Sequence, residues 1–332
     1  MIRPRIYGLF FLITLCLSCH GAHEPAAPPR AAAPRPTVPQ SVTPQPALPQ
    51  PVVPPQAGVK IEKSVVYGQA HGKNLTMDVF TPTGPVHGVG QGKGLLLLIS
   101  GKWISSPKAL QKTAPLCTTL VREHGYTVFA VTHGSQPEFV VSEIIPQITR
   151  SVRYVRANAK RFGIAPNRLG VIGFSSGGHL ALMMGLRGDD GLANSPDPVE
   201  RASSRVQAVI AFFPPTDFLN YGREGQLGLG TGKLGSMRHA FFREEPPASV
   251  EKAVGKAISP LYYVAPGDPP TLLIHGDRDP LVPLQQSERF QAAMKKSGVE
   301  CELTVKHGGG HGWLFMEWDI QRAMQWLGRH LQ

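Results

Sequence analysis

The chain has 332 residues, of which 34 are Lys or Arg and 23 are Asp or Glu, and its net charge is +11. This length is ample for one large core, so the chain does not need the disulfides or metals that stabilise very small scaffolds. The positive charge is not gathered into a basic run with interleaved aromatic residues, which argues against nucleic acid as a partner.

Residues 1–22 have the pattern of an export signal. A short basic start precedes the apolar stretch 6–17, which is too short to span a bilayer comfortably. Residues 17–19 resemble a bacterial lipobox, which would make Cys19 a lipidated anchor, although Cys16 takes the place of the usual leucine. Ordinary cleavage a few residues further on, and an uncleaved anchor, stay open. We expect an exported protein that is periplasmic, tethered to the outer membrane, or extracellular.

Residues 23–57 form a proline-rich linker in this interpretation. The stretch 24–57 holds 12 of the 32 prolines and has no apolar period, so it cannot build a core. Such a composition favours an extended, semi-rigid chain. A spacer behind a membrane anchor and an ordinary disordered tail both fit this composition.

Residues 58–332 alternate between predicted strands and helices. The segments 63–67 and 75–80 alternate apolar and polar residues, which predicts an antiparallel pair with a turn at 71–74. Further strands are predicted at 94–99, 126–132, 168–172, 206–213, 270–275 and 300–306, and helices at 107–124, 141–162, 178–184, 284–297 and 313–331. This order predicts an α/β domain with a mostly parallel, doubly wound sheet. The pattern breaks down at 214–260, where we expect a small cap or lid.

Gly173-Phe174-Ser175-Ser176-Gly177 joins a predicted strand to a predicted helix. A G-x-S-x-G at such a turn is a nucleophile elbow, whose glycines let strand and helix approach closely. Ser175 is then displayed at the carboxyl edge of the sheet. Since a serine hydroxyl is a weak nucleophile, it needs a histidine base and a carboxylate to orient that base.

Two downstream loops offer those partners. The loop after the strand at 270–275 carries Asp277 and Asp279, and the glycine-rich loop after the strand at 300–306 carries His307 and His311. Both loops follow strands, so they lie at the edge where the elbow serine is displayed.

The motifs Gly173 to His179, His275-Gly276-x-x-Asp279-x-x-Val282-Pro283 and Gly310-His311-Gly312 resemble those of the α/β-hydrolase superfamily. The resemblance covers residues 60–331 and is closest to small carboxylesterases related to acetyl-xylan, feruloyl and hormone-sensitive-lipase-like esterases. It implies an α/β-hydrolase fold without a cofactor, with Asp279 as the acid and His311 as the base. Asp277 would then brace its loop, and His307 would be exposed.

The resemblance also implies an oxyanion hole made of backbone amides. One is that of Ser176, and the other comes from Gly101 or Lys102 in Ile99-Ser100-Gly101-Lys102-Trp103, where related esterases carry His-Gly-Gly-Gly-Trp. Trp103 and His133 are candidate substrate contacts. The charge of Lys102 either faces the site or is simply solvated.

Other polar and aromatic residues have structural interpretations. We expect His179 to be a hydrogen-bonded packing residue, Asp217 a turn residue, and Phe241 a packing residue. The basic residues Arg150, Arg153, Arg156, Lys160 and Arg161 predict a solvated helix face. Cys117 and Cys301 lie in a predicted helix and a distant predicted strand, which favours two free thiols over a bridge, and no Cys and His cluster has zinc spacing.

These observations predict an exported serine carboxylesterase that acts on short-chain, acetyl-type esters, including carbohydrate esters. One alternative is a prolyl-oligopeptidase-like peptidase, which is disfavoured because 332 residues leave no room for a propeller domain. The other alternative is a binding protein that kept the hydrolase fold and lost catalysis, suggested by the altered loop at 99–103.

Overall fold

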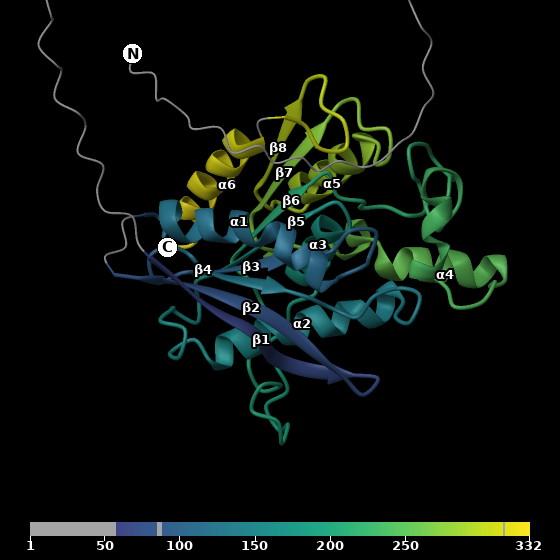
Figure 1. Ribbon diagram of the computed structural model, residues 1–332. Helices are drawn as coiled ribbons and strands as arrows, with labels where there is room; N and C mark the ends of the chain where they lie inside the picture. The colour runs from purple at the N-terminus through teal and green to yellow at the C-terminus, as the bar shows by residue number, and fades with distance from the viewer. Residues whose placement is uncertain (1–57, 85–87, 315) are drawn as a thin grey trace, which may run out of the picture. The chain divides into compact units, whose positions relative to one another are not determined.

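The computed structural model describes residues 58–84, 88–314 and 316–332 (Figure 1). The predicted export signal, Cys19 and the proline-rich linker lie outside these residues. Within the described part of the chain, no helix combines the length and the apolar character needed to cross a bilayer.

An eight-stranded sheet forms the centre of the domain, in the order β1-β2-β4-β3-β5-β6-β7-β8. Its strands are β1 Gly58–Ala70, β2 Lys73–Thr83, β3 Gly94–Leu98, β4 Thr127–Val131, β5 Leu169–Phe174, β6 Ala208–Phe212, β7 Thr271–Gly276 and β8 Cys301–Lys306. The pairs β1–β2 and β2–β4 are antiparallel, and every other neighbouring pair is parallel. The predicted mostly parallel sheet is therefore confirmed.

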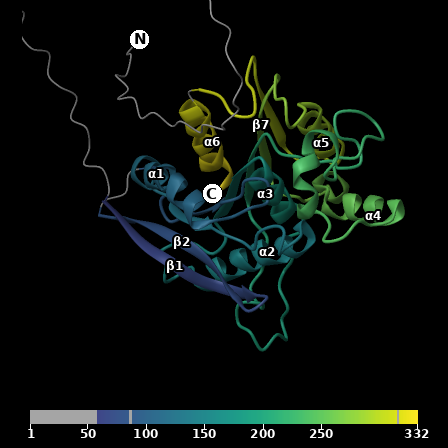
Figure 2. The same ribbon diagram turned by 45° about the vertical axis from the view of Figure 1, so that its right-hand side comes forward.

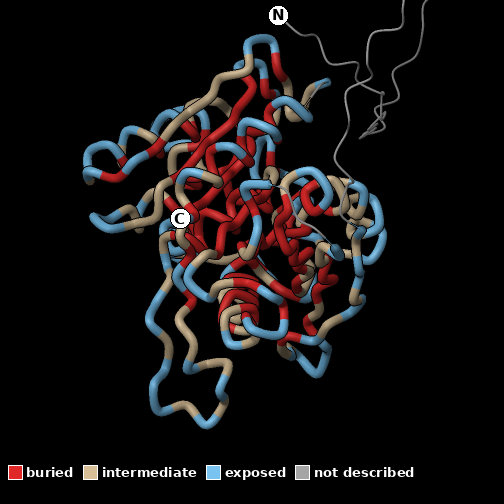
Figure 3. The backbone as a smooth tube through the Cα atoms, turned by 90° about the vertical axis from the view of Figure 1, so that its left-hand side faces the viewer, coloured by how far each residue is buried: buried red, intermediate tan, exposed pale blue. Residues whose placement is uncertain are grey.

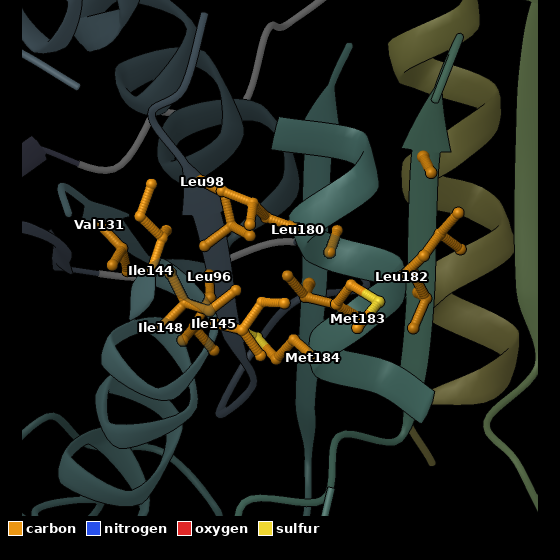
Figure 4. Close-up of a cluster of buried hydrophobic side chains, with 14 of the residues drawn as sticks. Leu96, Leu98, Val131, Ile144, Ile145, Ile148, Leu180, Leu182, Met183 and Met184 are labelled. Atoms are coloured by element: carbon orange, nitrogen blue, oxygen red, sulfur yellow. The ribbon is translucent and has the colours of Figure 1, made fainter. Parts of the chain in front are cut away.

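Helices cover both faces of this sheet, as Figures 1 and 2 show. They are α1 Pro107–His124, α2 Val141–Ala157, α3 Ser176–Leu186, α4 Ala248–Ile258, α5 Gln285–Lys296 and α6 Met316–His330. Alternate side chains of β3 enter different cores: Leu96 packs in the cluster that contains Ile144 of α2 and Leu180 of α3 (Figure 4), whereas Leu95 packs in the cluster that contains Met324 of α6. Because both faces are covered, the central strands are buried along their whole length (Figure 3).

Local signals explain the ends of α1. Ser106 accepts a hydrogen bond from the amide of Ala109, Pro107 occupies the first turn, and Gly125 ends the helix with a φ of 78°. The helix spans 107–124, as predicted. In contrast, α2 ends at Ala157, before the predicted end at residue 162. The prediction ran too far because the apolar spacing continues to Phe162. This residue lies beyond the helix, and its ring packs 5.0 Å from that of Phe129.

The segment 214–260 contains the short 3-10 helix η1, Gly232–Ala240, and helix α4; a second 3-10 helix, η2 Pro260–Tyr263, follows. Phe218 and Phe241 of this segment place their rings 5.9 and 5.0 Å from that of Trp103. The segment therefore packs on the loop that follows β3.

The basic residues of α2 do not form the solvated face that the sequence predicted. Arg153 is 5% exposed, and its guanidinium lies 2.6 Å from a carboxylate oxygen of Asp189. Arg156 donates to the carbonyl of Pro166, and Arg150 lies 2.7 Å from Asp197. For Arg150, Arg153 and Arg156 the prediction was wrong, because the loop after α3 brings carboxylates and carbonyls against this helix, which helical periodicity cannot show. Lys160 and Arg161 lie beyond the end of α2 and are exposed, as predicted.

Cys117 in α1 and Cys301 in β8 are free and buried, as predicted. Burial raises the pKa of each thiol to about 12. Neither thiol is therefore ionised near neutral pH, which makes both poor nucleophiles.

Candidate active site

Ser175 lies between the last residue of β5 and the first residue of α3, with a φ of 54° and a ψ of −120°. This conformation costs a non-glycine residue on the order of 1–3 kcal/mol. Its amide donates to the carbonyl of Phe212 and its carbonyl accepts from the amide of His179, both at 2.9 Å. A Cβ on Gly173 would lie 2.1 Å from the carbonyl oxygen of Gly177, so only glycine permits this approach. The predicted elbow is present, and its geometry explains its sequence.

The three predicted triad residues lie together. His311 places Nε2 2.9 Å from Oγ of Ser175 and Nδ1 2.7 Å from Oδ2 of Asp279. Ser175 follows β5, Asp279 follows β7 and His311 follows β8, so three strand ends converge at one edge of the sheet. A hydrogen on Nδ1 donates to the carboxylate, which leaves Nε2 as the acceptor for the serine hydroxyl.

Asp279 is held rigidly and stays ionised. Its Oδ1 accepts hydrogen bonds from the amides of Leu281 at 2.8 Å and Val282 at 2.9 Å. Burial raises the pKa of Asp279, but its contacts with His275 and His311 outweigh burial and hold the pKa well below its usual range. The carboxylate can therefore orient His311 and stabilise its charged form.

Asp277 and His307, the rival acid and base, pair with each other at 2.9 Å. The side chain of His307 is 89% exposed, and Asp277 also accepts from the amide of Gly308 at 2.7 Å. The hydrogen bond from His307 lowers the pKa of Asp277. As predicted, Asp277 braces its loop and His307 is exposed. Across residues 58–84, 88–314 and 316–332, no three His, Cys, Asp or Glu side chains are arranged to hold a metal ion.

The predicted oxyanion donors have different surroundings. Ser176 is the first residue of α3, where a backbone N–H has no acceptor within the helix. The amide of Gly101 donates to the carbonyl of Ile104 at 2.9 Å, so the structure does not support Gly101 as a donor. Lys102 and Trp103 form the centre of the same turn, and their amides donate to no acceptor among the described residues. In this turn the amides without an acceptor are therefore those of Lys102, one of the two predicted donors, and of its neighbour Trp103.

The structure does not support direct substrate contacts by the side chains of Trp103 and His133. Trp103 is 1% exposed, and its Nε1 donates to Nδ1 of His179 at 3.1 Å. His133 is 6% exposed, and its Nδ1 lies 2.6 Å from the carbonyl oxygen of Gly134. Burial lowers the pKa of His133 to about 4. Both residues follow predicted strands, so the sequence indicated the carboxyl edge of the sheet, where the triad lies. It could not show that their side chains are buried.

Phe213 and Trp313 are neighbours of the triad that the sequence analysis missed. The ring of Phe213 lies 4.7 Å from that of His311 and 5.8 Å from that of Trp313. Trp313 is fixed by a hydrogen bond of 2.8 Å from its Nε1 to Asp319. The sequence could have indicated both residues as neighbours of the site, since each lies next to a predicted strand end or loop at the carboxyl edge of the sheet. Phe213 thus gives the site an apolar side next to His311, and Trp313 packs on Phe213.

The sheet order, the elbow and the Ser-His-Asp geometry define an α/β hydrolase. The BD-FAE family model matches residues 77–294, which is more than half of the chain. The chain therefore belongs to the BD-FAE family.

Among curated proteins, the chain is similar to esterase LipQ of Mycobacterium tuberculosis, with 28% identity over 205 residues, which cover 62% of this chain and 46% of LipQ. It is also similar to isoprenylcysteine alpha-carbonyl methylesterase ICME of Arabidopsis thaliana, with 24% identity over 266 residues, which cover 78% of this chain and 58% of ICME. The chain thus spans about half the length of the curated relatives it matches.

Solved structures support the fold. An acetyl ester-xyloside bifunctional hydrolase from Caldicellulosiruptor lactoaceticus matches with a TM-score of 0.66 and 23% identity, covering 84% of this chain and 98% of that one. The esterase Est2 of Thermogutta terrifontis matches with a TM-score of 0.62 and 24% identity, covering 83% of this chain and 92% of that one.

Proposed function

We propose that this protein is a serine carboxylesterase. The main observation behind this proposal is the continuous hydrogen-bonded path from Ser175 through His311 to Asp279, with distances of 2.9 and 2.7 Å. Membership of the BD-FAE family and similarity to proteins named esterase and methylesterase support an ester as the substrate.

In this mechanism, Oγ of Ser175 attacks the ester carbonyl while Nε2 of His311 takes its proton. The tetrahedral intermediate collapses, the ester C–O bond breaks, and His311 returns the proton to the leaving alcohol. Water then attacks the acyl-enzyme with His311 as its base, which releases the carboxylic acid and restores Ser175. Asp279 holds His311 in the required tautomer and stabilises the imidazolium in both steps.

Backbone amides supply the charge stabilisation. The negative charge on the carbonyl oxygen develops beside Ser176 at the start of α3, where the helix dipole also favours it. The amide of Lys102 or Trp103 is the second donor in this proposal. Such donors act through the backbone, so the altered side chains of the 99–103 loop are compatible with catalysis.

The proposed substrates are short-chain esters, with acetyl esters of carbohydrates as the first class to test. The proposal rests on the resemblance to acetyl-xylan esterases and on the packing of Phe241 against Trp103, which sets the 214–260 segment close to the loop after β3. Activity across p-nitrophenyl esters of increasing chain length tests it. A preference for acyl chains longer than about eight carbons contradicts the short-chain proposal.

The deciding experiment replaces the nucleophile. Ser175→Ala should lower turnover of p-nitrophenyl acetate on the order of 10⁶-fold, as for comparable serine hydrolases. Ser142→Ala, an exposed serine of α2, is the matched control and should retain full activity. Full activity in Ser175→Ala contradicts the assignment.

Two further measurements test the alternative functions. Faster cleavage of aminoacyl-nitroanilides than of esters supports a peptidase, and folded protein that resists a fluorophosphonate probe supports a non-catalytic binding protein.

We also propose export and tethering through Cys19, which lies outside the described residues. The support is the basic and apolar start of the sequence, the lipobox-like residues 17–19 and the proline-rich spacer. Cys19→Ala should release the protein or leave it unprocessed in cell fractionation. The same soluble, cleaved species in wild type and variant supports simple secretion instead.

A further inference from the structure

The turn at 101–104 holds a backbone conformation that its sequence does not favour. Gly101 and Ile104 exchange two backbone hydrogen bonds of 2.9 Å, and the central residues Lys102 and Trp103 have φ values of 55° and 57°. Two-residue turns with positive φ at both centres usually carry Asn-Gly or other glycine pairs. Contacts from outside the turn must therefore hold Lys102 and Trp103 in place.

The structure shows those contacts. The indole of Trp103 is 1% exposed, packs 5.0 Å from the ring of Phe241, and donates from Nε1 to Nδ1 of His179 at 3.1 Å. Gln136 holds the backbone from the other side: its side-chain amide donates to the carbonyl of Lys102 at 2.8 Å, and its main-chain amide to the carbonyl of Trp103 at 3.3 Å. The side chain of Trp103 is thus the anchor of the turn in the interior.

His179 connects this anchor to the elbow. It lies one helical turn after Ser175, and its amide donates to the Ser175 carbonyl at 2.9 Å. Its fully buried ring donates from Nε2 to the carbonyl of Ile258, at the end of α4, at 2.7 Å. An indole N–H only donates and a carbonyl only accepts, so a neutral imidazole with its hydrogen on Nε2 satisfies both partners.

We propose that His179 is a positioning residue that acts through Trp103 to hold the amides of Lys102 and Trp103 toward the carbonyl oxygen bound at Ser175. This inference rests on the proposed esterase function. The amides gain their full interaction only when the oxygen becomes negative. Loss of the His179–Trp103 bond should therefore lower kcat and leave KM nearly unchanged.

The test compares His179→Phe with His179→Gln, using p-nitrophenyl acetate and a methyl trifluoromethyl ketone inhibitor. The ketone forms a C–O bond with Ser175, its carbonyl becomes an oxyanion, and the serine proton moves to His311, so its affinity reports on the oxyanion donors. We expect His179→Phe to lose on the order of 10- to 100-fold in kcat and in inhibitor affinity, with KM within about threefold. His179→Gln should recover most of the loss, because an amide supplies both an acceptor and a donor.

A second variant keeps the inference testable if His179→Phe does not fold. Trp103→Phe removes the indole donor and leaves His179 in place, and it should reproduce the loss of kcat and of inhibitor affinity. Because both residues act through one bond, the double variant should be no worse than the more severe single variant. The control is Tyr67→Phe, which removes a partly buried hydrogen bond of 2.7 Å to the carbonyl of Thr132 and should lower stability without changing kcat.

Three results overturn the inference: wild-type kcat and inhibitor affinity in folded His179→Phe, the same loss of kcat in Tyr67→Phe, or additive losses in the double variant. Failure of the proposed function is distinguishable, because a protein without an active catalytic serine shows no ester hydrolysis and no ketone binding in the wild type, and a peptidase cleaves aminoacyl-nitroanilides faster than esters. If only the inference is wrong, the wild type is active and binds the ketone, and the variants give one of the three contradicting results.

Discussion

Asp279 and His311 differ in their access to solvent although their side chains meet at 2.7 Å: the carboxylate is fully buried, and the imidazole is 23% exposed. The buried partner is fixed by two backbone amides, at 2.8 and 2.9 Å, so it cannot follow the histidine if the ring turns. The orientation of His311 is therefore set from inside the protein, and its Nε2 side remains open to a substrate.

The first prediction concerns this pair. Asp279→Asn keeps the shape of the residue but turns an acceptor-only group into one that can also donate, which favours the wrong tautomer of His311. We expect kcat for p-nitrophenyl acetate to fall on the order of 10⁴-fold, with little change in KM. Steady-state kinetics at neutral pH measures the effect. Asp277→Asn, which alters the rival carboxylate, should retain activity, and the reverse result identifies Asp277 as the acid.

The sequence predicted the sheet and the triad because both depend on local patterns. Buried strands appear in the sequence as continuous apolar runs, and Ser175 and Asp279 each follow such a run; His311 follows a strand in which apolar and polar residues alternate. The G-x-S-x-G spacing adds a steric requirement that the sequence displays directly: a Cβ at Gly173 would lie 2.1 Å from a backbone oxygen.

The wrong predictions concern side chains whose neighbours lie far away in the sequence. Arg153 has the spacing of a surface residue, and its carboxylate partner Asp189 lies on a loop beyond the next strand and helix. The amide of Gly101 is hydrogen-bonded to the carbonyl of Ile104 because the chain turns back there. The sequence Gly-Lys-Trp-Ile has no residue pair typical of such a turn. Trp103 was placed in the correct loop, but only the structure shows its indole turned inward to His179.

The second prediction tests the elbow glycine. Gly173→Ala introduces a Cβ that meets the carbonyl of Gly177, and this carbonyl cannot move without displacing the start of α3. We expect a loss of about 3 kcal/mol or more in the free energy of unfolding, measured in urea. Gly235→Ala, whose Cβ meets nothing within 4 Å, should change stability by less than about 0.5 kcal/mol. Equal effects in the two variants contradict the steric argument.

The third prediction compares an ion pair whose arginine is buried and whose aspartate is 54% exposed with a pair in which both side chains are exposed. Arg153→Ala removes a side chain that is only 6% exposed, leaves Asp189 without its partner and Glu200 with Arg150 alone, and removes a hydrogen bond of 2.5 Å to the carbonyl of Ala202. We expect a loss of about 3 kcal/mol in the free energy of unfolding. In the control pair Arg205 and Asp190, the side chains are 57% and 83% exposed. Arg205→Ala should therefore leave stability unchanged, and a loss as large as that of Arg153→Ala contradicts the distinction.

The fourth prediction concerns the two thiols. Burial raises the pKa of Cys117 and Cys301 to about 12, so neither forms the reactive thiolate in native protein at neutral pH. Alkylation with iodoacetamide, followed by mass spectrometry of the labelled peptides, should show no label at these positions before unfolding and complete labelling in denaturant. Rapid labelling of native protein at either position contradicts its burial.

The last prediction concerns acid stability, which two buried histidines should limit. Burial lowers the pKa of His133 and of His179 from 6.5 to about 4, so both are neutral in the folded protein at pH 5, whereas the unfolded chain is protonated there. The unfolded state then binds more protons, and stability falls as the pH drops from 6.5 to about 4. Each histidine contributes up to about 3 kcal/mol to this fall.

Urea unfolding at pH 7 and pH 4.5 measures the effect of pH on each variant. His179→Gln removes one titrating group, so its stability should fall less between the two pH values than that of the wild type. Tyr67→Phe lacks a hydrogen bond but retains both histidines, so its loss should equal that of the wild type. An equal pH dependence in His179→Gln and the wild type would contradict the lowered pKa of His179, because the folded protein would then take up the same proton as the unfolded chain between pH 7 and pH 4.5. A ring protonated at pH 4.5 would place a hydrogen on Nδ1 against the indole N–H of Trp103, so the hydrogen bond between the two side chains would be lost at that pH and kept at pH 7.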